Sequence, residues 1–488
     1  MGTLLDVLFF VPLAGVAAAL LRRRHLSETA TVLSGCAVFG LALAAASAVE
    51  HGGTLTSADR WLHLDALGAV FLLATGFLYA ACAVFSIGYL RADERRRDYL
   101  PFAGRYFTYL NLFGWTMVAV PLMNDFATLW IAVELTTIVS VLLVALDRTD
   151  AALEAAWKYV LIASFGLGMA LLALVVLYAA GSGPIGLAHI PRFGSYLAAA
   201  RDLDATQVKL AFLLATIGFG TKVGFAPLHT WLPDAHSEAP TPVSALLSGA
   251  LLANALYAIL RFYQVTVAVS GSGFPRHVLL VFGTLSLLVA AFFVLRQESY
   301  KRLLAYSSIE HMGVIALGVG FGVQLAVVGA LLHVINHAAA KSLAFFGAGS
   351  ILRRFDTKEI DQVRGAATAL PWSGPMFLAA ALALSGLPVS GIFRSEFQIV
   401  SGGFARPDYV WVALLVVLVN LAFFGLAWHA ARMVLTPHGK GRPRGETSWW
   451  MVTAMVGALA VVIWLGVSVP GGLSSLLSSA SALLGSSR

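Results

Sequence analysis

The amino-acid sequence predicts an all-α protein that crosses a membrane about fourteen times. Hydrophobic residues make up 59% of the 488 residues and charged residues only 12%, about half the share found in soluble domains. Apolar runs of about twenty residues recur along the chain, and each can cross a hydrocarbon core of ~30 Å. Backbone groups in lipid must be bonded within their own segment, so each run is expected to form a helix.

The expected spans cover most of the chain. Their approximate limits are residues 4–20, 29–49, 64–90, 106–122, 125–146, 157–180, 207–227, 240–262, 276–295, 303–321, 323–350, 368–400, 408–434 and 449–468. Prolines and glycines interrupt two of them, at Lys222–Pro227 and at Ser385–Gly391. Because proline removes a helical donor and clashes with the preceding turn, both are expected to be discontinuous helices. Paired broken helices are typical of transporters built from two inverted repeats.

Basic residues are distributed unequally between the two ends of the spans. Loops after odd-numbered spans hold 21 of the 32 Lys and Arg, including Arg95, Arg96 and Arg97, and the opposite loops hold 8. Cytoplasmic loops carry the excess of basic residues, so both termini are expected outside the cytoplasm. The basic residues are not clustered as a nucleic-acid groove requires, so nucleic acid is not an expected partner.

Sequence patterns for cofactor binding are missing. Cys36 and Cys82 lie inside apolar runs and form no CxxC pair, which argues against iron–sulfur, zinc and haem-attachment motifs. Gly218, Gly220 and Gly224 do not follow the nucleotide-binding fingerprint. We therefore expect no cofactor and no metal in this chain.

A first pair of ionisable residues is expected inside the membrane. Glu134 lies nine residues after Asp125, where its span begins, and is therefore about 14 Å deep and near the midplane. A charge there costs ~3 kcal/mol or more on insertion and needs a partner or water. Lys222, just before the first helix break, is the natural partner. The pair is either a static staple between helices or part of a proton path, and a lysine beside a broken helix favours the path.

A second group recurs at every fourth position. His333, His337 and Lys341 therefore share one face of a helix. Two histidines and a lysine in register at mid-membrane favour a proton relay over satisfied core histidines. A metal site is disfavoured, because the lysine would repel the ion and no carboxylate is adjacent in the sequence.

Further ionisable residues flank this face. Glu310 and His311, in the preceding span, either neutralise Lys341 or a protonated histidine or form a polar turn near the cytoplasmic end. Glu396, near the end of the second broken span, is the last candidate. Arg394 points to roughly the opposite face and is not an obvious partner for it.

The segment His229–Glu238 is dense in histidine and carboxylate residues. It is also short and proline-rich, and it follows a span that ends at the cytoplasmic face. A structured turn is therefore expected there rather than a metal site.

Four segments carry a resemblance to a known family. They are Leu129–Leu135, Pro227–His236, Lys301–Ser308 and His333–Lys341. The chain resembles the antiporter-like, proton-translocating subunits of respiratory complex I, membrane-bound hydrogenases and Mrp-type cation/proton antiporters. The form Tyr306–Met312 is most similar to the hydrogenase-4 component F branch.

The resemblance implies an organisation in four parts. These are three N-terminal helices (residues 1–100), a first five-helix repeat (101–265), a second, inverted repeat (270–440) and a C-terminal helix (445–488). It also implies a hydrophilic axis through the membrane that contains Glu134, Lys222, the His333–Lys341 face and Glu396. Supporting positions are Glu310, His311, His229, Lys158, Ser248 and Asn254.

One departure from the family concerns the eighth span, where members often place a lysine or histidine. Here Ser244–Arg261 holds no ionisable residue before Arg261, and only Ser248 and Asn254 offer polarity. Water can carry protons past such residues, but the two halves of the axis are less firmly connected at this point.

The leading hypothesis is a proton-translocating subunit of a respiratory or hydrogenase-type oxidoreductase in the plasma membrane. The chain itself would be a non-redox subunit, and the redox cofactors are expected in partner subunits. Two alternatives remain open: a stand-alone Mrp-like sodium/proton antiporter, and a structural membrane anchor whose axis does not conduct. Sodium-dependent proton flux by the chain alone would favour the first, and pumping that survives replacement of His333 and His337 would favour the second.

Overall fold

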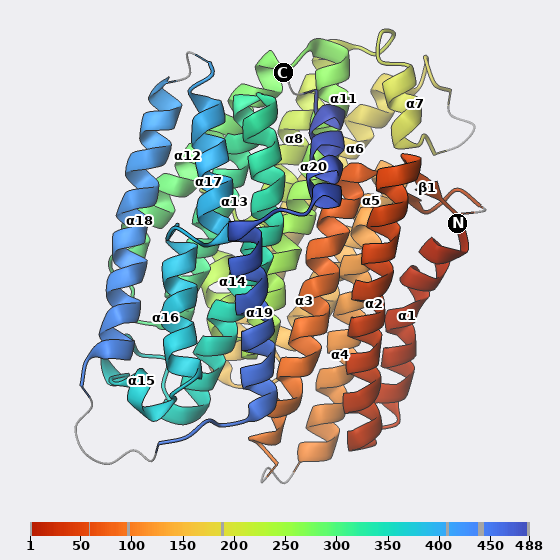
Figure 1. Cartoon of the computed structure of the whole chain (residues 1–488). Helices are drawn as coiled ribbons and strands as arrows, with labels where there is room; N and C mark the ends of the chain where they lie inside the picture. Colours follow the sequence, from red (N-terminus) through yellow and green to blue (C-terminus); the bar gives the residue numbers. More distant parts are fainter. Residues whose placement is uncertain are drawn as a thin grey trace.

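A computed structural model describes residues 2–57, 59–94, 98–186, 190–406, 409–437 and 444–485, and these form a bundle of long helices (Figure 1). The first half contains α1 (Gly2–Leu20), α2 (Arg24–Gly52), α3 (Ala66–Arg91), α4 (Tyr99–Ala119), α5 (Phe126–Val144), α6 (Asp150–Gly181), α7 (Phe193–Ala198), α8 (Ala205–Val223), α9 (Trp231–Glu238), α10 (Thr241–Leu246) and α11 (Leu252–Ser270). The second half contains α12 (Gly273–Val294), α13 (Tyr300–Phe321), α14 (Gln324–Phe355), α15 (Ala366–Ala369), α16 (Ser373–Leu384), α17 (Gly391–Gly403), α18 (Tyr409–Leu435), α19 (Trp449–Val467) and α20 (Gly471–Leu483). Smaller elements are 3-10 turns at Val120–Leu122 and Ile360–Gln362, a π turn at Leu247–Leu251, and a short hairpin of β1 (Leu55–Thr56) and β2 (His63–Leu64). The predicted basic cluster Arg95–Arg97 lies outside the described residues.

Eleven helices in these described ranges are long and apolar enough to cross a membrane, which confirms the predicted all-α, multi-span architecture. The number fourteen stays a prediction. The three remaining expected spans correspond to α4, α8 and the α16–α17 pair, which are more polar or interrupted.

Both helix breaks occur where the sequence predicts them. α8 ends at Val223, and its C-cap Gly224 has a φ of +85°, which glycine adopts without a steric penalty. The chain resumes as α9 at Trp231. The second break separates Leu384, the last residue of α16, from Gly391, the first residue of α17. The division into two inverted repeats stays a prediction.

The helices differ in how far the bundle shields them. α13 is buried at every position except Arg302, and Thr241–Thr266, which includes α10 and most of α11, is buried throughout. By contrast, α6 and α18 expose large apolar side chains such as Phe165 and Val417. In a membrane these outer faces contact lipid or neighbouring subunits, so polar groups on α13 and α14 lie in the protein interior.

Small residues let the inner helices approach each other closely. A Cβ atom added at Gly283 of α12 would lie 2.9 Å from the carbonyl oxygen of Gly313 on α13, and one added at Gly313 would lie 2.7 Å from Gly283 O. Close backbone contact through small residues is a common packing mode between membrane helices. It fixes α13, which carries several ionisable residues, against α12.

A buried ion pair joins α3 to α11 near one end of the bundle. Arg261 donates to both carboxylate oxygens of Asp65 at 2.7 Å, and Tyr257 accepts hydrogen bonds of 3.0 and 2.8 Å from the same guanidinium. Asp65 is also the N-cap of α3, and it accepts a bond from Gly68 N. The pair therefore anchors the start of α3 to α11.

Candidate functional site

Lys222 is buried in the last turn of α8. Its ammonium group donates a 2.8 Å hydrogen bond to Val133 O and a second bond to the Thr137 hydroxyl, both on α5. Glu134 lies beside these contacts, and its Oε2 is buried without a hydrogen-bond partner in the described part of the chain. Lys222 and Glu134 interact electrostatically but form no direct salt bridge. A salt bridge between these two side chains therefore does not join α5 to α8.

The segment after the first break is a helix, so the predicted turn is wrong for Trp231–Glu238. Trp231 donates from Nε1 to Thr221 O at 2.7 Å, which ties α9 back to α8 across the break. Its ring also stacks on Tyr159 with centroids 4.3 Å apart. Proline misled the sequence interpretation because Pro233 lies in the first helical turn, where proline is tolerated.

His236 on α9 is a buried ionisable residue that the sequence analysis did not assign to the axis. Its Nδ1 lies 2.8 Å from Leu232 O, and its Nε2 has no hydrogen-bond partner within the described ranges. The charges of Lys341 and Lys301 both act on this ring. His236 thus belongs with the lysines of α13 and α14.

Lys301 is one of the 21 basic residues that the sequence places in loops after odd-numbered spans, and for Lys301 that prediction is wrong. It lies in the first turn of α13 with 1% of its surface exposed. Its ammonium group donates to Ser237 O at 2.8 Å and to Ala239 O at 2.6 Å. These carbonyls end α9, where the helix dipole places partial negative charge. A buried cation therefore caps α9.

Lys341 on α14 is buried against α13. Its ammonium group donates to Leu304 O at 2.8 Å and to the Ser307 hydroxyl at 2.9 Å. Glu310, one turn further along α13, is 3% exposed, so the alternative of a surface-facing polar turn is wrong. Glu310 acts on Lys341 through its charge without a direct bond.

Three imidazoles meet where α13 packs on α14. His311 Nδ1 lies 3.0 Å from His333 Nε2, and the His311 ring centroid lies 5.2 Å from that of His337. All three rings are buried. His333 Nδ1 is bonded to Ser395 Oγ on α17 at 2.9 Å. His333 and His337 share a face as predicted, but His311 is the ring that contacts both.

Glu396 on α17 completes this cluster. Its Oε1 lies 4.0 Å from His311 Nδ1. On the other side, the carboxylate contacts Gly386 in the helix break and lines a cavity of about 240 Å³ together with Ser385 and Asn420. Arg394 points elsewhere and donates to Val467 O at 3.3 Å, in agreement with the sequence interpretation.

The supporting positions fall into different places. Ser248 lies in the π turn and is 2.7 Å from the Ser308 hydroxyl, which in turn donates to Leu304 O, the carbonyl that Lys341 also uses. Asn254 instead donates to Met117 O at 3.0 Å and so binds α11 to α4.

Of the two other supporting residues, Lys158 lies closer to the surface and His229 is buried. Lys158 pairs with Glu154 at 2.5 Å and with Asp234 at 3.7 Å in an exposed network. His229 precedes α9, and its ring centroid lies 6.2 Å from that of Tyr306. Lys158 therefore does not belong with the buried ionisable residues of α8, α13 and α14.

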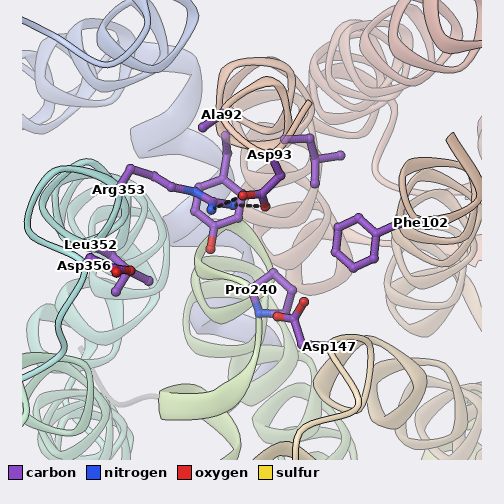
Figure 2. A pocket seen from close by; sticks show the side chains of 10 residues that line it. Ala92, Asp93, Phe102, Asp147, Pro240, Leu352, Arg353 and Asp356 are labelled. Atoms are coloured by element: carbon purple, nitrogen blue, oxygen red, sulfur yellow. Dashed lines mark hydrogen bonds and ion pairs between the residues drawn. The ribbon is translucent and has the colours of Figure 1, made fainter. Parts of the chain in front are cut away.

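A polar cavity of about 610 Å³ opens where α3, α5 and α14 end, and Figure 2 shows its lining. Arg353 points toward Asp93 and makes two 2.8 Å hydrogen bonds with its carboxylate. Asp147 lies across the cavity, and Pro240 forms part of the wall. Pro240 directly follows Ala239, whose carbonyl binds Lys301, so the cavity reaches the neighbourhood of the buried lysine.

The fold and the site together define a polytopic membrane protein whose interior holds ionisable side chains at Lys222 on α8 and around Lys341 and His311, where α13 packs on α14. The sequence matches the family described as "NADH:quinone oxidoreductase/Mrp antiporter, TM" over residues 123–422, and the chain belongs to this family. A hydrogenase-4 component F homolog of Methylacidiphilum infernorum is 37% identical over 390 residues, which cover 79% of this chain and 80% of that protein.

More distant similarities agree with this assignment. NADH-quinone oxidoreductase subunit N of Desulforudis audaxviator is 29% identical over 422 residues, covering 83% of this chain and 80% of the relative. A subunit in the structure of the Mrp complex from Dietzia sp. superimposes with a TM-score of 0.86 over 99% of this chain and 98% of its own, at 20% identity. The latter likeness confirms the fold.

Proposed function

We propose that this chain carries protons across a membrane as the proton-translocating subunit of a respiratory or hydrogenase-type oxidoreductase complex. The observation that carries the proposal is the set of buried ionisable side chains inside the bundle, joined by the partly buried Glu396. The buried members are Lys222, His236, Lys301, Lys341, His337, His311 and His333, and Glu396 lies next to His311. Burying so many ionisable groups is costly in a membrane protein, and such groups mark ion pathways.

Each half of this set has a distinct chemistry. In the first half, Lys222 exchanges a proton under the influence of the Glu134 charge, because a negative charge nearby favours the protonated lysine. In the second half, the hydrogen bond between His311 and His333 is a direct route for a proton between two rings. Glu396 then exchanges the proton with the cavity beside Gly386.

The halves meet at α9 and the π turn rather than at an ionisable residue of the eighth span. His236 lies under the influence of Lys341 and Lys301, and the Ser248–Ser308 hydroxyl pair adjoins the carbonyl that binds Lys341. Hydroxyl groups donate and accept hydrogen bonds at once, so Ser248 and Ser308 can pass a proton between themselves. The Leu304 carbonyl only accepts, so it holds this hydroxyl pair next to the Lys341 ammonium group, and water would have to complete the transfer between them.

The surroundings of the chain follow from the same proposal. The unequal distribution of basic residues supports an orientation with both termini on the non-cytoplasmic side, in what we propose to be the plasma membrane. Other membrane and peripheral subunits of the complex would supply the redox cofactors. The transported ion would be the proton, with sodium as the alternative that measurement must exclude.

The test is proton uptake by inverted vesicles containing the assembled complex, measured with a pH-sensitive dye while redox turnover is followed in the same sample. Lys222→Ala is expected to abolish uptake. Lys209→Ala is the matched control, because Lys209 lies on the same helix about 20 Å away and is only partly buried. Normal uptake in the Lys222→Ala complex would contradict the proposal, and sodium-dependent flux by the chain alone would replace it with an antiporter.

A further inference from the structure

We infer that His311, His333 and Glu396 form a binding site for a late first-row divalent metal ion such as Zn²⁺, and that the bound ion stops proton movement. One ligand atom from each residue lies within 4.8 Å of the others. Two imidazoles and one carboxylate are a common ligand set for catalytic and regulatory zinc. The binding site stands on geometry alone, and only the predicted block rests on the proposed function.

The distances are close to those that zinc needs. With Zn–N and Zn–O bonds of ~2.0–2.2 Å, tetrahedral ligand atoms lie roughly 3.3 Å apart. His311 Nδ1 is 3.0 Å from His333 Nε2 and 4.0 Å from Glu396 Oε1. The three ligand atoms lie within 4.8 Å of one another. Shifts of up to roughly 1.5 Å, mainly in the flexible Glu396 side chain, would therefore bring them to tetrahedral spacing.

Ser395 holds His333 in the tautomer that a metal requires. The Ser395 hydroxyl donates to a backbone carbonyl of α17, at 3.0 Å for Gly391 O or 2.9 Å for Ile392 O. With the hydroxyl proton directed at either carbonyl, its oxygen can accept from His333 Nδ1–H at 2.9 Å. The lone pair of His333 then lies on Nε2, which faces His311 Nδ1. A metal ion bound between the rings would replace the Nδ1 proton of His311, which would move to Nε2 of that ring or be released. Histidine ligands of metals are commonly oriented by such a second hydrogen bond.

Two residues of the cluster have side-chain atoms that could bind a metal ion. Glu396 Oε1 has no hydrogen-bond partner in the described part of the chain, and neither ring nitrogen of His337 has one there. The His337 ring centroid is 5.2 Å from that of His311, so His337 is the nearest candidate for a fourth ligand. A water molecule is the other candidate, as in open zinc sites.

Two arguments against a metal come from the sequence, and the fold answers the first of them. The missing carboxylate comes from α17 rather than from a neighbouring position. The Lys341 ammonium group donates to Leu304 O and the Ser307 hydroxyl and makes no bond to the three ligands. Its charge still acts on His311 and His337, so it opposes a bound cation through space.

The cavity beside Glu396 adjoins the site. It has a volume of about 240 Å³, and Glu396, Ser385 and Asn420 supply the polar atoms of a wall that is otherwise apolar. A metal bound behind it would occupy the lone pairs of two imidazoles and the carboxylate. Metal ions compete with protons for such groups, so the relay would be blocked.

Direct binding to the purified full-length chain in detergent tests the site without turnover. Equilibrium dialysis against Zn²⁺ is expected to show one site, and Co²⁺ is expected to give the visible bands of tetrahedral coordination. Glu396→Gln, which keeps the side-chain shape, should weaken binding at least tenfold. Ser395→Ala should weaken it by roughly ten- to a hundredfold through loss of orientation. His277→Ala is the control, since that histidine is exposed at the end of α12.

Each outcome decides a separate point. Equal Zn²⁺ affinity in the wild type and in Glu396→Gln would overturn the site, as would the absence of binding above the level set by the exposed histidines. In the assembled complex, Zn²⁺ should inhibit proton uptake in the wild type and in His277→Ala with the same concentration dependence. Binding without inhibition would confirm the site and refute the block. Because Lys222→Ala is tested without metal, failure of the proposed function is seen independently.

Discussion

Lys222 donates a 2.8 Å hydrogen bond to the backbone carbonyl of Val133, the residue that precedes Glu134. The ammonium group is thus held beside the carboxylate by neutral groups of α5 rather than by a direct salt bridge. A charge held in this way can gain or lose its proton without breaking an ion pair, whose disruption is costly when buried. The geometry suits a group that titrates during a transport cycle.

Thr137 supplies the second bond to Lys222, so Thr137→Val should impair this step. Hydrogen bonds to charged groups contribute ~1.5–3 kcal/mol, and their loss here should lower proton uptake per turnover roughly tenfold. Thr116→Val is the control, because that buried hydroxyl donates only within its own helix, to Phe113 O. Equal uptake in both variants would show that the Thr137 bond has no part in transport.

Gly386→Ala should displace Glu396. A Cβ atom at this position would lie 2.6 Å from Glu396 Oε2, and its φ of +73° also strains any other residue. We expect uptake to fall roughly ten- to a hundredfold, as misplacement of a reacting group by ~1 Å does in enzymes. Gly271→Ala carries the same strain at φ +76° with open space around it. That variant should lose stability alone, and a similar loss of uptake in it would refute the explanation.

Ser248→Ala and Asn254→Ala should have different effects although both change a buried polar residue of the eighth span. Ser248 bonds Ser308 next to the Lys341 site, so its loss should lower uptake about fivefold, as expected for ~1 kcal/mol. Asn254 bonds Met117 O, so its loss should reduce thermal stability and leave uptake per folded complex unchanged. Reversed phenotypes would place the link between the halves elsewhere.

Asp65→Asn should destabilise the protein without touching the relay. Removing one partner of a buried pair leaves Arg261 uncompensated and costs ~3–5 kcal/mol. The readout is thermal unfolding in detergent, and the exposed Asp59 provides the control Asp59→Asn. A wild-type unfolding temperature in Asp65→Asn would argue that α3 is anchored by other contacts.

The same pair predicts a dependence on pH. Burial by itself would raise the pKa of the Asp65 carboxyl, but the charge and hydrogen bonds of Arg261 outweigh this and hold the pKa below its usual value. The unfolded value is about 4, so the stabilisation is fully present above pH ~4 and is lost as pH falls through the lower folded-state pKa. The difference in unfolding temperature between wild type and Asp65→Asn should therefore shrink on acidification below pH ~4. A constant difference would contradict this assignment.

The span pattern, the helix breaks and the relay face could be predicted from the sequence because they depend on local signals. Apolar length and the 3.6-residue period identify helices, and proline with glycine identifies breaks. Thus Lys222 and the His333–Lys341 face were identified before any fold was known. Inward-facing charges are visible in this way because they are rare among apolar residues.

Relationships between helices could not be predicted in the same way. His311 appeared only as a supporting residue, since its contacts to His333 and Glu396 depend on how α13, α14 and α17 pack. Lys301 has the sequence features of a loop residue because it lies at the end of an apolar span. The sequence does not show that α9 packs against it and accepts its hydrogen bond. His236 was assigned to a turn for the same reason. Glu134 stays the predicted partner of Lys222, whereas the hydrogen bonds of Lys222 to Val133 O and the Thr137 hydroxyl depend on how α5 packs on α8.

The π turn at Leu247–Leu251 affects how many residues the eighth span can contain. A π turn holds about one residue more than an α turn, so it sets the angular position of everything that follows in α11. Deleting one residue there would let the π turn close to an ordinary α turn, and Arg261 and Asn254 would keep their partners. Deleting one residue between the π turn and Arg261 would instead rotate Arg261 away from Asp65 by about 100°. The π turn is therefore the one place in the eighth span where a one-residue gap in an alignment leaves the docking of the two halves unchanged.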